Sequence, residues 1–355
     1  MKKIYRIADL PSSNRAFAVL PIVRAYVDAM RPLPDGNVNV MGWLLLPDKQ
    51  LDQIEVYLDG IQVMSVPLAQ RPDVAAVFKW IPHASTCGFN FILPFAPSSG
   101  TSILETIAFN GNTPSGRFSH FVRADIDHFA SPTEDHVFRF THTRDLHFFK
   151  LSGLKVFGEF MESVRRHGSL SAMKRILDWG CGCGRVTAHL MAIEDGGEVF
   201  GCDIDPFAIE WCNRHLRESA FAVLGPLPPA PYPDTFFDLI VSYSVFTHLA
   251  RDIQSAWLQE MHRILSPGGL FLATTHGEFA FAFAKSCLNA KFPRSGIEDS
   301  SKDTTLDGIA PEGYYRATFQ SKEYTVREFG RYFQVLEYVE RGAGNLQDLI
   351  VLRKQ

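Results

Sequence analysis

The residues best suited to chemistry lie in the stretch 175–186, where an apolar run ends in Asp178. Three glycines follow at alternate positions before an expected helix: Gly180, Gly182 and Gly184. Because glycine has no side chain, a ligand can lie against this backbone and against the exposed N–H groups where the helix starts. Asp203 ends the next apolar run, and its carboxylate can accept hydrogen bonds from both hydroxyls of a ribose. The pattern predicts a site for a cofactor that contains a nucleoside.

Two histidines are candidates for acid–base chemistry. His248 and His276 each follow an expected strand, and sites in open α/β sheets lie at the carboxyl ends of the strands. A neutral imidazole can take the proton of a hydroxyl group that acts as a nucleophile. Each histidine is therefore a candidate general base, and each could equally orient a loop or bind a backbone carbonyl.

From residue 173 onward, expected strands alternate with expected helices, which is typical of a parallel sheet covered by helices. The expected strands are 175–179, 198–202, 237–242 and 270–275. The expected helices are 145–166, 185–193 and 252–265, with another beginning at Asp205-Pro206, an N-cap acid followed by proline. The segments 334–338 and 347–352 predict a closing antiparallel strand pair.

The glycine spacing distinguishes two classes of cofactor site. Dinucleotide sites need G-x-G-x-x-G, and in this chain the last position is Arg185 or Thr187, depending on the register. The pattern instead resembles motif I of class I S-adenosylmethionine-dependent methyltransferases. The segments 231–241 and 258–269 resemble the blocks that precede and form the fourth and fifth strands of that family.

This resemblance implies an α/β fold: a Rossmann-like, seven-stranded methyltransferase domain, mostly parallel, with an antiparallel C-terminal strand. It implies S-adenosylmethionine as the cofactor. The implied contacts are Asp178, Gly180, Cys181 and Gly182 for the methionine part, Asp203 for the ribose and Ile204 for the adenine edge. Many relatives carry an acid after the third strand, but this chain reads Leu224-Gly225-Pro226 there, so no side chain is assigned to the adenine amino group.

Composition and turn signals divide the chain into segments. We expect an N-terminal extension (1–19), a small β-sandwich (20–123), a linker (124–150) and the methyltransferase domain (151–355), with a substrate-cap insertion at about 279–320. Asp59-Gly60 lies between two strand-like runs and predicts a hairpin. The four histidines of the linker fit no compact ligand spacing, so no metal is expected. In the insertion, Tyr314 and Tyr315 either contact a polar acceptor or pack into the core.

Bulk properties exclude several classes of function. Hydrophobic residues make up 46% of the chain and charged residues 21%, as in ordinary globular proteins. The formal net charge of −4 disfavours a nucleic-acid partner. No apolar run approaches the ~20 residues that cross a bilayer, so no integral membrane segment is expected. The six cysteines form no C-x-x-C pair, which favours reduced thiols and a cytoplasmic location.

The expected substrate comes from resemblance alone. The segments 245–249, 274–277 and 345–348 resemble a bacterial methyltransferase subgroup associated with glycosyltransferases, and the N-terminal segment resembles a sandwich found with surface-glycan enzymes. We therefore expect methylation of a sugar hydroxyl in a bacterial glycan intermediate, with a small-molecule or glycan substrate and a glycosyltransferase-pathway protein as a partner. Two alternatives stay open: methylation of an unrelated small molecule, and a non-catalytic scaffold that keeps the cofactor fold. Arg71-Pro-Asp73-Val could also be a turn with an internal ion pair.

Overall fold

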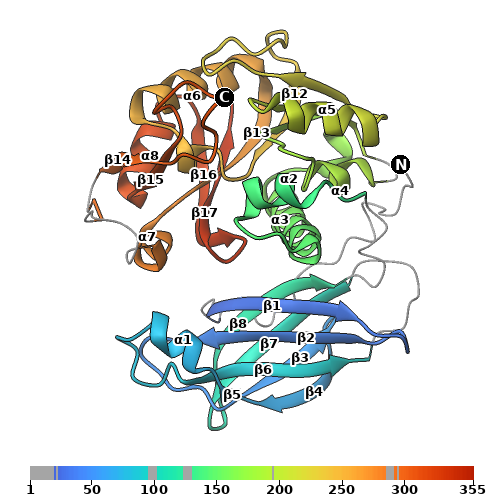
Figure 1. Cartoon of the computed structure of the whole chain (residues 1–355), viewed down its shortest axis with the longest axis vertical. Coiled ribbons are helices and arrows are strands. Elements are labelled where there is room, and N and C mark those ends of the chain that lie inside the picture. The colour runs from blue at the N-terminus through green and yellow to red at the C-terminus, as the bar shows by residue number, and fades with distance from the viewer. Residues whose placement is uncertain are drawn as a thin grey trace. The chain divides into compact units, whose positions relative to one another are not determined.

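The computed structural model describes residues 20, 23–94, 102–122, 130–193, 196–284, 292–293 and 296–355. These residues divide into two compact units, one ending at residue 122 and one beginning at residue 130 (Figure 1). The expected N-terminal extension, the first residues of the expected linker and parts of the expected insertion lie outside the described residues. The expected domain boundaries stay predictions.

The N-terminal unit contains two antiparallel four-stranded sheets and helix α1 (Pro72–Val77). One sheet has the order β1-β2-β6-β5, with β1 (Arg24–Pro32), β2 (Val38–Leu45), β5 (Ala69–Gln70) and β6 (Thr86–Leu93). The other has the order β4-β3-β7-β8, with β3 (Gln53–Leu58), β4 (Ile61–Pro67), β7 (Ser102–Asn110) and β8 (Thr113–Val122). Asp59 and Gly60 join β3 to β4 with positive φ angles, so the predicted hairpin is present. The assignment of this unit as a small sandwich stays a prediction.

Arg71 is held by two carboxylates in the N-terminal unit. Its Nε and Nη2 atoms donate to the two oxygens of Asp73 at 2.8 and 2.7 Å, and Nη1 donates to Asp28 at 2.5 Å. A Cβ on Gly88 would lie 2.6 Å from the Arg71 side chain. The motif therefore forms an ion-paired start to α1, which agrees with the structural interpretation of these residues.

The C-terminal unit is built on a seven-stranded sheet with the order β11-β10-β9-β12-β13-β17-β16. Its strands are β9 (Arg175–Trp179), β10 (Glu198–Asp203), β11 (Ala220–Val223), β12 (Phe237–Ser242), β13 (Leu265–Thr275), β16 (Gln334–Ala343) and β17 (Gln347–Arg353). The first five pair in parallel, and β17 runs antiparallel to both of its neighbours. The predicted Rossmann-like sheet with its antiparallel C-terminal strand is present.

The described helices of this unit are α2 (Glu134–Thr141), α3 (Leu146–His167), α4 (Thr187–Met191), α5 (Pro206–His215), α6 (Arg251–Ile264), α7 (Glu278–Ala284) and α8 (Lys322–Phe329), with 3-10 helices η4 (Leu170–Ala172) and η5 (Phe246–His248). Two of them depart from the expectations: α4 is shorter than expected, and α2 forms within the expected linker. The insertion contributes α7 and the antiparallel pair β14 (Ile297–Lys302) and β15 (Arg316–Gln320).

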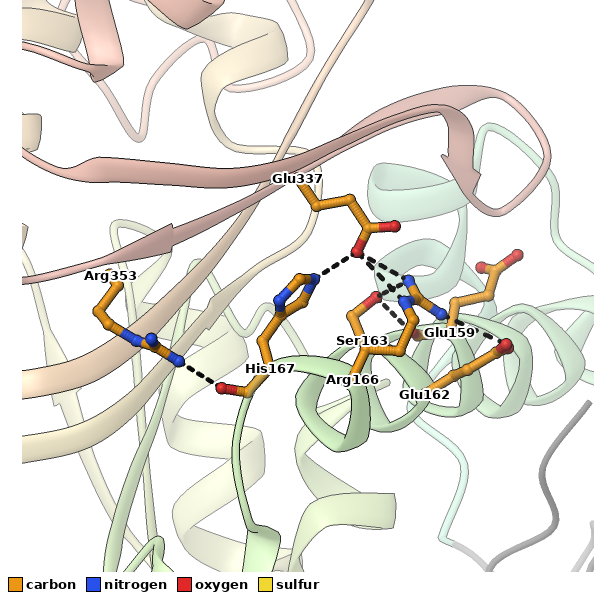
Figure 2. A network of polar contacts seen from close by, with 7 residues as sticks. All are labelled: Glu159, Glu162, Ser163, Arg166, His167, Glu337 and Arg353. Atoms are coloured by element: carbon orange, nitrogen blue, oxygen red, sulfur yellow. Dashed lines mark hydrogen bonds and ion pairs between the residues drawn. The ribbon is translucent and has the colours of Figure 1, made fainter.

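The C-terminal end of α3 is tied to the edge strand β16 by charged groups (Figure 2). Nε and Nη2 of Arg166 donate to Glu337 Oε2 at 3.2 and 3.1 Å, and His167 Nε2 lies 2.7 Å from the same oxygen. Arg353 of β17 also donates to the His167 carbonyl. These contacts fix the helix that leads into β9, the strand that carries the glycine turn.

Candidate cofactor and acceptor site

The turn after β9 requires glycine at three positions. Gly180, Gly182 and Gly184 have φ angles of +78°, +51° and +74°, a region that side chains disfavour. A Cβ would lie 2.1 Å from Val245 Cγ2 at Gly180 and 2.4 Å from Leu216 Cδ1 at Gly184. The backbone of the turn is thus closely packed on two sides.

The N–H groups of the turn correct one expectation. Those of Gly180 and Cys181 donate to the Cys202 carbonyl at 2.8 and 3.0 Å, and that of Gly182 donates to Asp203 Oδ2 at 2.7 Å. The turn bends back over the end of β10, so these three groups are engaged and not open to a ligand. Any ligand contact with free amides must therefore come from other residues of the turn.

Asp203 joins the turn to the loop after β10. Its carboxylate is buried and also accepts the Asp205 N–H at 2.8 Å. Burial raises the pKa of Asp203 to about 6, and the backbone hydrogen bonds oppose this rise. A carboxylate offers about four lone-pair sites, so room remains for a donor such as a hydroxyl of a ribose. The residue therefore fits the expected role.

Asp178, the acid that ends β9, has a partner that the sequence did not reveal. Thr187 Oγ1, at the start of α4, donates to Asp178 Oδ2 at 2.6 Å. Burial raises the pKa of Asp178 to about 6, and the nearby Asp203 adds to the rise. Thr187 thus orients one of the two acids at this turn.

The loop after β10 separates structural from candidate binding residues. Asp205 is 0% exposed; its Oδ1 caps α5 by accepting from Phe207 N at 2.9 Å, and its Oδ2 pairs with Arg139. Asp205 is therefore a helix cap, as predicted. Ile204 is half-buried next to Asp203 and keeps its expected place at the adenine edge as a prediction.

His248, on η5 after β12, is fixed on one face and one edge. Its ring stacks on Tyr315 at 4.0 Å with an interplanar angle of 11°. Its Nδ1 lies 3.0 Å from the Arg316 carbonyl, an acceptor only, so Nδ1 carries the proton and Nε2 holds the lone pair. Asp303 Oδ2 lies 3.7 Å from the same Nδ1. Burial lowers the pKa of His248 to about 4 against the opposing effect of Asp303, so the ring is neutral near pH 7.

His276, after β13, lies beside His248 with a ring-centroid distance of 6.2 Å. It stacks on Phe319 at 5.2 Å. Burial lowers its pKa to about 3, and within the described part of the chain its Nδ1 is buried without a hydrogen-bond partner. The structure thus brings the two predicted histidines together, and both are neutral.

A hydrogen-bond network explains why the segments around residues 244, 274 and 347 matter. Thr274 Oγ1 donates to Gln347 Oε1 at 2.7 Å, and Gln347 Nε2 donates to Ser244 Oγ at 2.9 Å. Ser244 N in turn donates to Thr274 Oγ1 at 2.8 Å. The network ties the loop that carries His248 to two strands, so its residues position the site.

The two tyrosines of the insertion lie in different surroundings. Tyr314 packs against the large core cluster, whereas Tyr315 stacks on His248, and contact of Tyr315 with a polar acceptor stays a prediction. The pKa of Tyr315 is raised, by burial first and then by Asp303 and Asp203. Among the described residues, no group of three possible ligands could hold a metal ion.

Part of the C-terminal unit is similar to known proteins. Residues 177–273 match the family model of a methyltransferase domain. The chain is 26% identical over 144 residues to the tRNA N(3)-cytidine methyltransferase METTL2 of Gallus gallus, covering 37% of this chain and 39% of that protein. It is 32% identical over 122 residues to the malonyl-[acyl-carrier protein] O-methyltransferase of Halorhodospira halophila, covering 34% and 39%. Among solved structures, an S-adenosylmethionine-dependent methyltransferase from Mesorhizobium loti is similar, with 16% identity, a TM-score of 0.40 and coverage of 55% of this chain and 98% of that chain.

The matched segment, the glycine turn and the strand order together define a class I S-adenosylmethionine-dependent methyltransferase domain. Its cofactor is S-adenosylmethionine. The chain spans only about two fifths of the length of the two curated relatives described above. No helix in the described part of the chain is both long and apolar enough to span a membrane.

Proposed function

We propose that this protein transfers the methyl group of S-adenosylmethionine to a hydroxyl oxygen, and that the acceptor is a sugar of a bacterial glycan intermediate. The observation that carries the oxygen acceptor is the state of His248. A neutral imidazole with its Nδ1–H bound to the Arg316 carbonyl presents Nε2 as a base. Three relatives are named as O-methyltransferases, one of ubiquinone biosynthesis, one of malonyl-[acyl-carrier protein] and one of fatty acids, which supports an oxygen acceptor but not one substrate class.

When bound, S-adenosylmethionine supplies a methyl group on a positively charged sulfur. The chain's own residues would hold it through Asp178, the glycine turn and Asp203. His248 Nε2 would take the proton of the acceptor's hydroxyl group, so that the oxygen could accept the methyl group. Asp303, 3.7 Å from Nδ1, lowers the energy of the imidazolium that this transfer forms. His276 is the second candidate base, and its buried, unpartnered Nδ1 supports a role in holding a donor group of the acceptor.

The sugar acceptor rests on the resemblance to the glycosyltransferase-associated subgroup, and so does a partner from that pathway. Tyr315 supports it because an aromatic ring beside hydrogen-bonding groups suits a polar ring-shaped ligand. The buried free thiols of Cys181 and Cys202 fit a reducing compartment and support a cytoplasmic location.

The test mixes the full chain with methyl-labelled S-adenosylmethionine and a panel of nucleotide-linked and lipid-linked sugars. We expect label in one sugar class, and at least a hundredfold lower turnover in His248→Asn with cofactor affinity unchanged. His215→Asn is the control, because His215 is exposed on α5. Transfer to an unrelated small molecule would move the acceptor to another class. Cofactor binding without transfer to any compound would support the scaffold alternative. Normal turnover in His248→Asn would exclude His248 as the base.

A further inference from the structure

Helix α2 contacts both segments of the candidate cofactor site through adjacent residues. Phe140 lies over the glycine turn, where a Cβ on Gly182 would meet its ring at 2.9 Å. Arg139 pairs with Asp205 in the loop after β10. Neither residue belongs to the segment matched by the methyltransferase family, so this part of the site is added by the chain outside that segment.

Arg139 is connected through Asp205 to Asp203, the carboxylate that we expect to bind the ribose. Asp205 is fully buried and uses its other oxygen to cap α5, so Arg139 supplies its balancing charge. The Asp205 N–H donates to Asp203 Oδ1, and Asp203 Oδ2 accepts the Gly182 N–H. Arg139 and Phe140 therefore act on the two ends of one hydrogen-bonded path.

The apolar side of α2 fixes this placement. Val137 and Phe140 pack with Cys183 of the glycine turn, Ala208 and Trp211 of α5, and Phe149 of α3. Thr133 caps the start of the helix by accepting the His136 N–H. Phe138 is 45% exposed on the same helix, and Arg144 makes an exposed ion pair with Asp135. The helix thus has a contacting side with Arg139 and Phe140 and an outer side with Phe138, and Arg144, which follows the helix, is the exposed arginine for comparison.

We propose that α2 is a clamp for S-adenosylmethionine, in which Arg139 and Phe140 are positioning residues that hold the glycine turn and the Asp203 loop at a fixed spacing. A preorganised site loses less freedom when the ligand binds, so the clamp increases affinity and slows dissociation. The inference rests on the cofactor part of the proposed function and is independent of the acceptor. A helix in this place can also act as a block, and the two roles predict opposite changes in affinity.

The experiment measures binding of S-adenosylmethionine and S-adenosylhomocysteine to the full chain by calorimetry at 10 °C, and dissociation by stopped-flow tryptophan fluorescence. For Arg139→Gln and Phe140→Ala we expect a Kd at least tenfold higher, with faster dissociation. The matched controls Arg144→Gln and Phe138→Ala should stay within twofold of the wild type. Arg139→Lys should recover part of the affinity.

Arg139→Gln leaves a buried carboxylate without its partner, so the variant can lose stability as well. The double variant Arg139→Gln with Asp205→Asn removes both charges and keeps a residue that can cap α5. An unchanged Kd in folded Phe140→Ala and in the double variant would overturn the proposed clamp. Tighter binding in these variants would overturn it too, and would indicate that α2 obstructs the cofactor site. If the clamp variants lose affinity but no acceptor is ever methylated, the clamp stands and the proposed function fails.

Discussion

Acidification should weaken cofactor binding through Asp203. Burial raises the pKa of this carboxyl to about 6, so the free protein protonates it within an accessible range of pH. In the proposed role of Asp203, the hydroxyls of a ribose would donate to the ionised carboxylate, so the bound state would favour loss of the proton. Binding below pH 6 must then release a proton, and the Kd rises as the pH falls.

The size of the effect follows from the pKa. With a value of about 6 in the free protein and a much lower value in the complex, affinity falls roughly tenfold between pH 7.5 and pH 5, or about 1.4 kcal/mol. Asp178 also has its pKa raised to about 6 and lies at the methionine end of the expected site. If the cofactor favours the ionised form of Asp178 too, the affinity of the wild type falls by up to roughly a hundredfold over this range, because each proton contributes about one power of ten.

Calorimetry with S-adenosylhomocysteine between pH 8 and pH 5 measures this slope. Asp203→Asn should bind about 1.5–3 kcal/mol more weakly at pH 7.5, as expected for lost hydrogen bonds to a charged group. Its pH dependence should be shallower than that of the wild type by one proton. Glu210→Gln serves as the control, because Glu210 is an exposed acid on α5. An identical slope in Asp203→Asn and the wild type would refute the assignment of the titrating group.

Three further predictions concern other parts of the structure. Gly180→Ala should weaken S-adenosylhomocysteine binding at least tenfold in calorimetry, because its Cβ would lie 2.1 Å from Val245 Cγ2, and Val245→Ala should restore part of the loss. Lys354→Met should lower the free energy of unfolding in urea by about 2–3 kcal/mol, because Lys354 Nζ donates to the His262 and Leu265 carbonyls at 2.7 and 2.8 Å; no change would mean that solvent replaces these bonds. Arg71→Gln should lower stability by about 1 kcal/mol and leave cofactor affinity unchanged, and a change in affinity would contradict its purely structural role.

The parts of the fold that the sequence predicted are those encoded by neighbouring residues. β9 and β12 begin and end at the expected residues because each has a short apolar run at its centre and lies between clear breaks. The cap at Asp205 was predictable because an acid followed by proline is a local signal. α4 begins later than expected because the left-handed turn at Gly184 delays the start of regular helix to Thr187.

The parts that the sequence did not predict depend on contacts between distant residues. α2 lies in a polar, aromatic segment whose composition indicates a linker. Its place is set by contacts with distant residues: Arg139 pairs with Asp205, Phe140 packs on Gly182, and the apolar side of the helix packs on Cys183 and Ala208. Asp303 gives no signal in sequence, because its proximity to His248 arises from the return of the chain after β14. Asp299 likewise accepts the Arg251 N–H at the start of α6, from 48 residues away.

The two histidines show how far sequence reasoning reaches at the site itself. Their positions after β12 and β13 were enough to place both at one edge of the sheet. Their difference comes from their surroundings: His248 has its Nδ1 bound to the Arg316 carbonyl, with a carboxylate nearby, whereas the His276 Nδ1 is buried without a partner in the described chain. A base must present a lone pair and have its cationic form stabilised after it takes a proton. We therefore keep His248 as the proposed base, because Asp303 lies 3.7 Å from its Nδ1 and partly opposes the burial that lowers the pKa of His248 to about 4.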